Sequence, residues 1–265
     1  MLNCACQNQS TKTIEVLPYV GSDDIDSVVE VNNPFGRNHM TKVIYYKKSN
    51  TLFLTYNEDG ELIDSLAEDK KYRIHGLRFV KLNNGSKRYQ NFKHGVKDGS
   101  GWLIDEKGIV RERVYYVDGK ALKELITYFP NGSLKTYQYL TTYGIVFEQE
   151  YTEVGDLIKD RGSPVALFRE QQDSVQVGND FRAIVELAIP SRAELRLFFF
   201  NPSDSTLLKE IPITYSENSS YVKIASEATS QNDNGVYLHW ILSSSSNKGE
   251  VKRDGYGAHY FKVYR

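Results

Sequence analysis

The chain has 265 residues, of which 40% are hydrophobic and 25% charged, and these values are typical of a globular protein with one large domain or two ordinary ones. The net charge of −1 gives no basis for a nucleic-acid partner or for attraction to a membrane surface, and no run of about 18 apolar residues predicts a membrane-spanning helix. Nineteen tyrosines and twelve phenylalanines, against two methionines, favour β-strands.

Residues 1–40 are polar and irregular, and we expect a tether and a lead-in strand, around residues 13–18, in this segment. The two cysteines of the chain, Cys4 and Cys6, both lie here, so we expect no disulfide or thiolate metal cluster in a folded domain. The Ala5-Cys6 step is similar to the processing site of a bacterial lipoprotein signal and predicts lipidation of Cys6. The basic and apolar regions of such a signal are absent from the sequence, so either its start has been trimmed or the two cysteines are a chance pair.

Residues 41–161 are punctuated by glycine at a fixed interval. One series has intervals of 25, 23, 24 and 23 residues, and a second series lies between its members with intervals of 24 and 25. The first series is Gly60, Gly85, Gly108, Gly132 and Gly155, and the second is Gly95, Gly119 and Gly144. A sustained period of this length is typical of a repeat architecture in which each unit packs only on its neighbours.

The residues before these glycines indicate hairpin turns. Asn-Gly and Asp-Gly pairs tolerate the positive φ angles of two-residue hairpin turns, and short apolar and aromatic runs lie between them. These pairs are Asp59-Gly60, Asn84-Gly85, Asp118-Gly119 and Asn131-Gly132. Each period therefore predicts one β-hairpin, and the array predicts an elongated antiparallel sheet of four to five hairpins.

Residues 162–265 lose the glycine period and show longer alternating strands with serine-rich turns. Leu238, Trp240 and Leu242 share one face of such a strand, and residues 195–200 form a strongly apolar run. Strands of this spacing predict a β-sandwich of roughly seven strands, similar to an immunoglobulin-like domain without its disulfide. The fold class we expect is all-β, with a repeat sheet followed by this sandwich.

The segment 91–102 (NFKHGVKDGSGW) and the segment 128–135 (YFPNGSLK) carry an aromatic residue followed by spaced glycines. This pattern resembles MORN repeats, and the second segment is closer to their bacterial, YwqK-type variant. The resemblance covers about residues 56–158 and implies a scaffold or binding surface. Together with the sandwich, the chain is similar to envelope lipoproteins of Bacteroidota-like bacteria.

Aromatic side chains are the candidate binding residues, because they offer a large rigid area and, in tyrosine, a polar tip. In the array they are Tyr115, Tyr128, Tyr137, Tyr139 and Trp102. The alternative, which the repeat favours for any single tyrosine, is a packing ladder across the strands. A local basic patch could meet anionic groups or could simply protect strand edges by charge. It contains Arg78, Lys81, Lys87, Arg88, Lys93 and Lys97.

Phe198 and Phe200 belong to a strand that is apolar on both faces. Such a strand is either covered by another part of the chain or forms an interface. We expect both rings to be buried against the repeat array, with homodimerisation as the alternative.

The sequence contains no nucleophile elbow, phosphate-binding loop or metal-binding box, and none of the five histidines has metal-ligand spacing. We therefore expect no catalytic residue, no metal and no cofactor. The hypothesis is a non-enzymatic binding or scaffold protein of the bacterial cell envelope, a surface or periplasm-facing lipoprotein with a protein or glycan partner. One alternative is a soluble, cytoplasmic, antitoxin-like protein-binding module. Another is a carbohydrate-active enzyme, because two carboxylates that meet only in space cannot be read from a sequence.

Overall fold

The structure is a computed structural model that describes residues 25–32, 40–47, 51–170, 174–201, 206–216, 219–227 and 235–264. Cys6 and the lead-in strand expected around residues 13–18 lie outside the described residues. The described residues form strands, turns and bends, so the expected all-β class is confirmed. No helix long and apolar enough to cross a membrane occurs among them.

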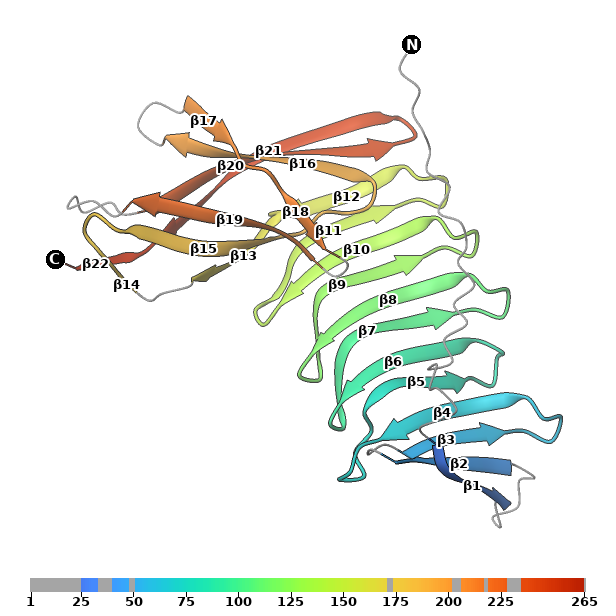
Figure 1. Cartoon of the computed structure of the whole chain (residues 1–265). Coiled ribbons are helices and arrows are strands. Elements are labelled where there is room, and N and C mark those ends of the chain that lie inside the picture. The colour runs from blue at the N-terminus through green and yellow to red at the C-terminus, as the bar shows by residue number, and fades with distance from the viewer. Residues whose placement is uncertain are drawn as a thin grey trace.

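The first part of the chain is one 12-stranded antiparallel sheet, the repeat array, in which every strand pairs with its neighbours in sequence (Figure 1). The strands are β1 (Ile25–Asn32), β2 (Met40–Tyr46), β3 (Thr51–Tyr56), β4 (Leu62–Glu68), β5 (Gly76–Lys81), β6 (Lys87–Lys93), β7 (Val96–Ile104), β8 (Val110–Val117), β9 (Lys120–Tyr128), β10 (Leu134–Thr141), β11 (Gly144–Tyr151) and β12 (Leu157–Gly162). Strand β1 falls within the expected tether, so the sheet begins earlier than the predicted boundary at residue 41.

Most of the described turns of the array are of two kinds, which lie at opposite ends of the strands. In the first kind, two backbone hydrogen bonds close the turn. The amide of the glycine donates to the carbonyl of the residue three positions earlier. The amide of that earlier residue donates to the carbonyl of the residue directly after the glycine. At Gly60, which has φ +76°, these bonds join Gly60 to Asn57 at 3.0 Å and Asn57 to Glu61 at 2.9 Å. The same pair of bonds recurs at Gly85, Gly108, Gly132 and Gly155. The first glycine series therefore marks one repeated turn.

The second kind is a tight two-residue turn. His94-Gly95 has φ angles of +52° and +87°, and Asp118-Gly119 has +48° and +80°. Of the four pairs expected to form such turns, only Asp118-Gly119 does so. In the other three, the Asn or Asp residue does not have a positive φ angle, and the glycine alone adopts the left-handed conformation. The loop is one residue longer and adds a bulge beside the glycine, which increases the local strand twist.

The second part of the chain is a sandwich of two four-stranded sheets with a further two-stranded pair. Its strands are β13 (Val165–Glu170), β14 (Ser174–Gln176), β15 (Asp180–Leu187), β16 (Ala193–Asn201), β17 (Thr206–Glu210), β18 (Thr214–Ser216), β19 (Ser219–Glu227), β20 (Gly235–Ser246), β21 (Gly249–Tyr260) and β22 (Lys262–Tyr264). One sheet has the order β13-β15-β19-β18 and the other β17-β16-β20-β21. These orders correspond to the A-B-E-D and C′-C-F-G sheets of an immunoglobulin-like fold.

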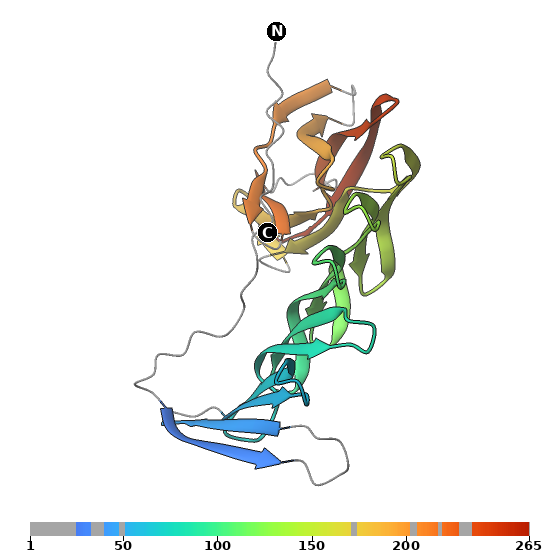
Figure 2. The ribbon, with the colours of Figure 1, turned by 90° about the vertical axis from the view of Figure 1, so that its right-hand side faces the viewer.

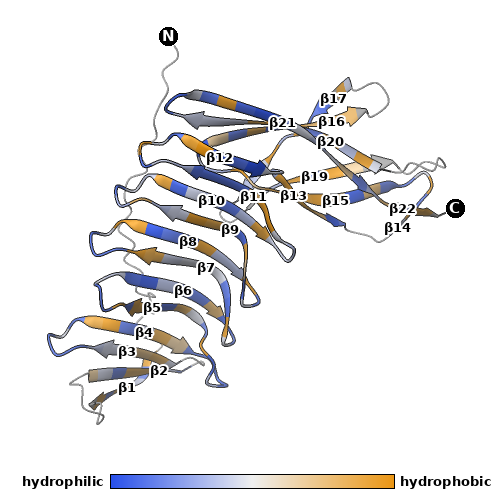
Figure 3. Ribbon diagram, turned by 180° about the vertical axis from the view of Figure 1, so that it is seen from behind, coloured by the Kyte–Doolittle hydropathy of each residue, from blue (hydrophilic) through white to orange (hydrophobic). Residues whose placement is uncertain are grey.

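The sandwich core is built by alternation along each strand. Its central side chains are fully buried, with an exposed fraction of 0%. They are Phe181, Val185, Leu197, Val222, Leu238 and Leu242. In the array, by contrast, hydrophilic and hydrophobic residues are interspersed along the strands (Figure 3), and most side chains are half-buried. A sheet of this kind is open to solvent on much of its area.

The last strands of the array pack against the sandwich, and the rest of the sheet extends away from it (Figures 1 and 2). Tyr137, Tyr139, Phe147 and Tyr151 are at most 1% exposed and belong to the same hydrophobic cluster as the sandwich core. Polar contacts also cross this junction, among them a 2.6 Å hydrogen bond from Gln149 Nε2 to Ser244 Oγ. The two parts therefore share one core.

Candidate binding site

The two faces of the array differ in what they carry. One face, here called the ladder face, is followed from strand to strand through residues that pair directly, and at β10 it packs on the sandwich. Its members are Phe79, Tyr89, Trp102, Arg113, Ile126 and Tyr137. The opposite face, here called the groove face, carries the row Arg78, Gln90, Gly101 and Val114.

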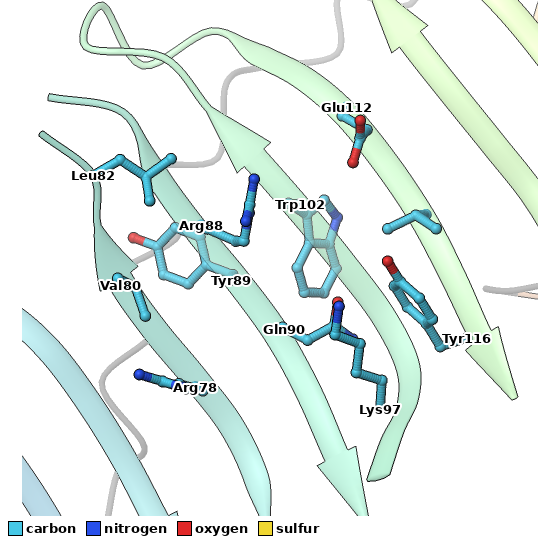
Figure 4. A pocket seen from close by; sticks show the side chains of 11 residues that line it. Arg78, Val80, Leu82, Arg88, Tyr89, Gln90, Lys97, Trp102, Glu112 and Tyr116 are labelled. Atoms are coloured by element: carbon cyan, nitrogen blue, oxygen red, sulfur yellow. The ribbon is translucent and has the colours of Figure 1, made fainter. Parts of the chain in front are cut away.

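The groove face contains a hollow of about 360 Å³ over β5 to β8 (Figure 4). Its lining residues are Arg78, Val80, Leu82, Arg88, Tyr89, Gln90, Lys97, Trp102, Glu112, Val114 and Tyr116. The hollow forms because β7 carries glycine on this face, at Gly99 and Gly101, where its neighbours carry side chains.

The side chain of Gln90 lies over Gly101 in the floor of the hollow. Its side chain is so close to Gly101 that a Cβ atom at position 101 would overlap it. Gln90 is 7% exposed, and its Nε2 donates a 3.0 Å hydrogen bond to the carbonyl of Asn91. A larger residue at position 101 would push Gln90 outward and fill the hollow.

The charges of the hollow are only partly paired. Two guanidinium nitrogens of Arg78 donate to the carboxylate of Asp64, Nε to Oδ1 at 3.2 Å and Nη2 to Oδ2 at 2.7 Å. These hydrogen bonds raise the pKa of the Arg78 guanidinium. Lys97 Nζ lies 4.9 Å from the ring centre of Tyr116. Among the described residues, neither Lys97 nor Arg88 pairs with a carboxylate.

The hollow thus offers two cations, an amide and an aromatic ring on an open sheet face, with one carboxylate, that of Glu112, also in its lining. Figure 4 shows Gln90 and Lys97 next to each other beside Tyr116, with Arg88 on the far side of the hollow from Tyr116. Cationic donors of this kind bind carboxylate or phosphate oxygens, and the half-buried ring of Tyr116 adds contact area. The other cations of the expected basic patch include Lys81, which pairs with Glu61 instead.

The tyrosines expected to bind a partner lie mainly on the ladder face. Tyr137 and Tyr139 are 1% exposed, and their hydroxyls donate to Glu124 and Glu186, each at 2.9 Å. Burial, the largest cause, and the adjoining carboxylates raise the pKa of both phenols. These two side chains are therefore part of the junction and not of an exposed surface.

The other array residues of that set are half-buried. Tyr128 packs against the shared core, and Tyr115 lies under Lys123, whose Nζ is 5.0 Å from its ring centre. Trp102 belongs to the ladder face by its pairing, although it also borders the hollow. The arrangement is that of a packing ladder, the alternative interpretation of the same pattern.

Phe198 and Phe200 are not placed as expected. Phe198 is buried, at 9% exposed, and Phe200 is half-buried, but neither belongs to the hydrophobic cluster that joins the array to the sandwich. Both lie on the opposite face of β16 from Leu197, which is in that cluster. Strand alternation puts Leu197 and Phe199 inward and the two flanking rings outward. Phe200 packs on Tyr256 with ring centres 4.7 Å apart, and both outward rings lie near His239.

The structure also brings together three residues that sequence spacing did not connect. Asp69, His75 and His94 present ligand atoms within 4.8 Å of one another in two neighbouring connections at the strand ends of the array. Asp69 and His94 are 25 residues apart, which is one repeat period, so their turns are stacked. The repeat period is the signal by which this cluster could have been found.

No protein-family model matches the chain, and no curated protein matches it.

Proposed function

We propose that this chain is a non-enzymatic binding protein whose groove face receives an extended, acidic partner, either a protein segment or a glycan. The observation that carries this proposal is the open hollow over β5 to β8, in which Arg88 and Lys97 have no carboxylate partner among the described residues. Two free cations beside a buried amide match the charge and hydrogen-bonding needs of carboxylates. The array would be a MORN-like scaffold in this function, with one hairpin per period.

The shared core supports a scaffold role. Because Tyr137, Tyr139 and Phe147 are buried in one cluster with the sandwich, the array is held at a fixed angle to it. Rigid placement lowers the conformational entropy that this chain loses when a partner binds. An envelope location, with the chain tethered through Cys6, rests on the Ala5-Cys6 step and is part of the proposal.

Charge reversal at the hollow tests the binding function. The full chain with Arg88→Glu and Lys97→Glu is compared with the unchanged chain and with a control in which Lys209→Glu and Lys223→Glu make the same charge change on the sandwich. The probes are an oligoglutamate peptide and a polyuronate oligosaccharide, titrated at low and moderate salt. We expect at least one probe to bind the unchanged and control chains and to bind the hollow variant about tenfold or more weakly. The probe that binds identifies the partner class.

Equal binding of both probes by all three chains, or binding by none, would contradict the acidic-partner proposal. Location is tested separately by fractionating native host cells and measuring the mass of the N-terminal peptide. Recovery in the membrane fraction with a lipid on Cys6 supports the envelope proposal. Recovery in the cytoplasm alone, with unmodified Cys6, would remove it and leave the cytoplasmic protein-binding alternative.

A further inference from the structure

The connection between β4 and β5 differs from the other turns on its side of the sheet. Where the later hairpins have the two-residue turns His94-Gly95 and Asp118-Gly119, this connection is a loop over residues 69–75. The loop contacts the next turn directly, since the amide of Gly95 donates a 2.7 Å hydrogen bond to the carbonyl of Ile74. Side chains from the loop and from the His94 turn therefore meet.

Asp69 is held in place by the backbone of its own loop. Its Oδ1 accepts hydrogen bonds from the amides of Lys71 at 2.8 Å and Arg73 at 3.2 Å, and its side chain is 13% exposed. These contacts fix the carboxylate and leave Oδ2 directed at the neighbouring turn. The hydrogen bond that Arg73 donates to Oδ2 is the largest cause of a lowered pKa for Asp69, and the ring of His94 contacts the same oxygen.

Two imidazoles complete the cluster. His94 Nδ1 lies 2.8 Å from Asp69 Oδ2, and the ring centres of His75 and His94 are 4.8 Å apart. His94 occupies a position with φ +52°, where Asn or Asp is the usual residue of such a turn. The turn geometry therefore does not require a histidine.

A cationic group already occupies the space between these atoms. Arg73 Nη2 lies 2.7 Å from Asp69 Oδ2 and 3.0 Å from His94 Nδ1. The carboxylate and the imidazole nitrogen thus converge on one positive charge. The Arg73 side chain is 41% exposed, so it can swing into solvent without disturbing a packed core.

We propose that Asp69, His75 and His94 form a site for a divalent transition-metal ion of the Zn²⁺ or Co²⁺ type, from which Arg73 withdraws when the ion binds. Two imidazole nitrogens and one carboxylate oxygen are a ligand set typical of such ions. In a tetrahedral shell the ligand atoms lie about 3.3 Å apart, because metal–ligand bonds are about 2.0–2.1 Å. Small rotations of the side chains close the present separations, and the fourth position is left to water or to a partner group.

The experiment titrates Co²⁺ and Zn²⁺ into the untagged full chain, with Cys4→Ser and Cys6→Ser introduced because thiolates would compete for the same ions. The visible spectrum of bound Co²⁺ reports the coordination, and calorimetry gives the dissociation constant for Zn²⁺. The principal variant is His94→Asn, since Asn keeps the turn and removes the ligand. The matched control is Asp118→Asn, in the equivalent turn one period later.

We expect one ion per chain and a loss of more than about tenfold in affinity for His94→Asn and for Asp69→Asn, because even outer-shell partners are worth about 10–100-fold. Asp118→Asn should bind as the unchanged chain does. Arg73→Gln should bind the ion more tightly, since the competing cation is gone. Unchanged affinity in His94→Asn, or no bound ion in either the parent chain or Arg73→Gln, would overturn the proposal. Melting curves recorded without metal show whether each variant is folded.

Discussion

The phenolic oxygen of Tyr139 donates a 2.9 Å hydrogen bond to Oε2 of Glu186, and this bond joins β10 of the array to β15 of the sandwich. Both side chains are buried, and the second carboxylate oxygen of Glu186 pairs with Arg169 at 2.7 Å. The carboxylate is therefore shared between the two parts of the chain. Tyr139, a tyrosine of the repeat array, therefore links the array to the sandwich through a buried hydrogen bond.

Tyr139→Phe removes this hydroxyl and keeps the ring in the shared core. We expect a loss of about 1–2 kcal/mol in the free energy of unfolding, because Glu186 loses one buried donor but keeps Arg169. Urea unfolding measures the change. The control is Tyr115→Phe, on the ladder face outside the junction, which should change stability by less than about 0.5 kcal/mol. Equal effects of the two substitutions would show that the junction bond contributes nothing.

Gly162 is required at the point where the array ends. It has φ +86°, and a Cβ atom there would overlap the carbonyl of Val146 and the Cα of Phe147 on β11. Gly178 has nearly the same angle, φ +85°, but a Cβ atom there would meet nothing within 4 Å. A substitution at Gly178 would therefore introduce backbone strain alone, whereas one at Gly162 would introduce backbone strain and steric overlap.

We expect Gly178→Ala to lower the free energy of unfolding by about 1 kcal/mol, from the left-handed backbone alone. Gly162→Ala should lower it by about 3 kcal/mol or more, because β11 must also shift. Thermal and urea unfolding of the two variants provide the comparison. Similar losses in both would mean that β11 and β12 can separate freely at this point.

The array could be predicted because its determinants are local. A glycine such as Gly132 needs a positive φ angle whatever surrounds it, and its recurrence along the chain sets the hairpin period. The sandwich could be predicted from alternation for the same reason. The turn type was harder to predict, because Asn131-Gly132 suits both a two-residue turn and the longer turn with a bulge, and strand register decides between them.

The candidate sites depend on contacts that a single strand does not encode. The pattern around Tyr115 resembles the one around Tyr139, yet only Tyr139 meets the sandwich, because the sandwich covers only the last strands. The hollow depends on Gly101 lying directly between Gln90 and Val114, which requires the register. For Phe198, the alternation was evident in the sequence, but which face the core would cover was not.

Glu148, on β11, gives the junction region a pH dependence that can be measured. Its side chain is 7% exposed and contacts Lys159 Nζ at 2.8 Å, Arg161 Nε at 2.6 Å and Gln138 Nε2 at 2.7 Å. Lys159, followed by Gln138 and Arg161, holds the pKa of this carboxyl below its ordinary value of 4.5. Because the folded-state pKa is the lower one, the ionised group stabilises the fold above pH 4.5, and that contribution is lost as the pH falls through the folded-state pKa.

Glu148→Gln should therefore cost about 1–2 kcal/mol of unfolding free energy near neutral pH, where two cations lose their carboxylate but remain partly exposed to water. The difference from the unchanged chain should shrink as the pH is lowered toward about 3, since the native carboxyl is then increasingly protonated. Urea unfolding over this pH range measures both effects. Glu153→Gln, in an exposed turn, is the control and should show no such trend. A cost that stays constant with pH would mean that Glu148 acts through its shape and hydrogen bonds and not through its charge.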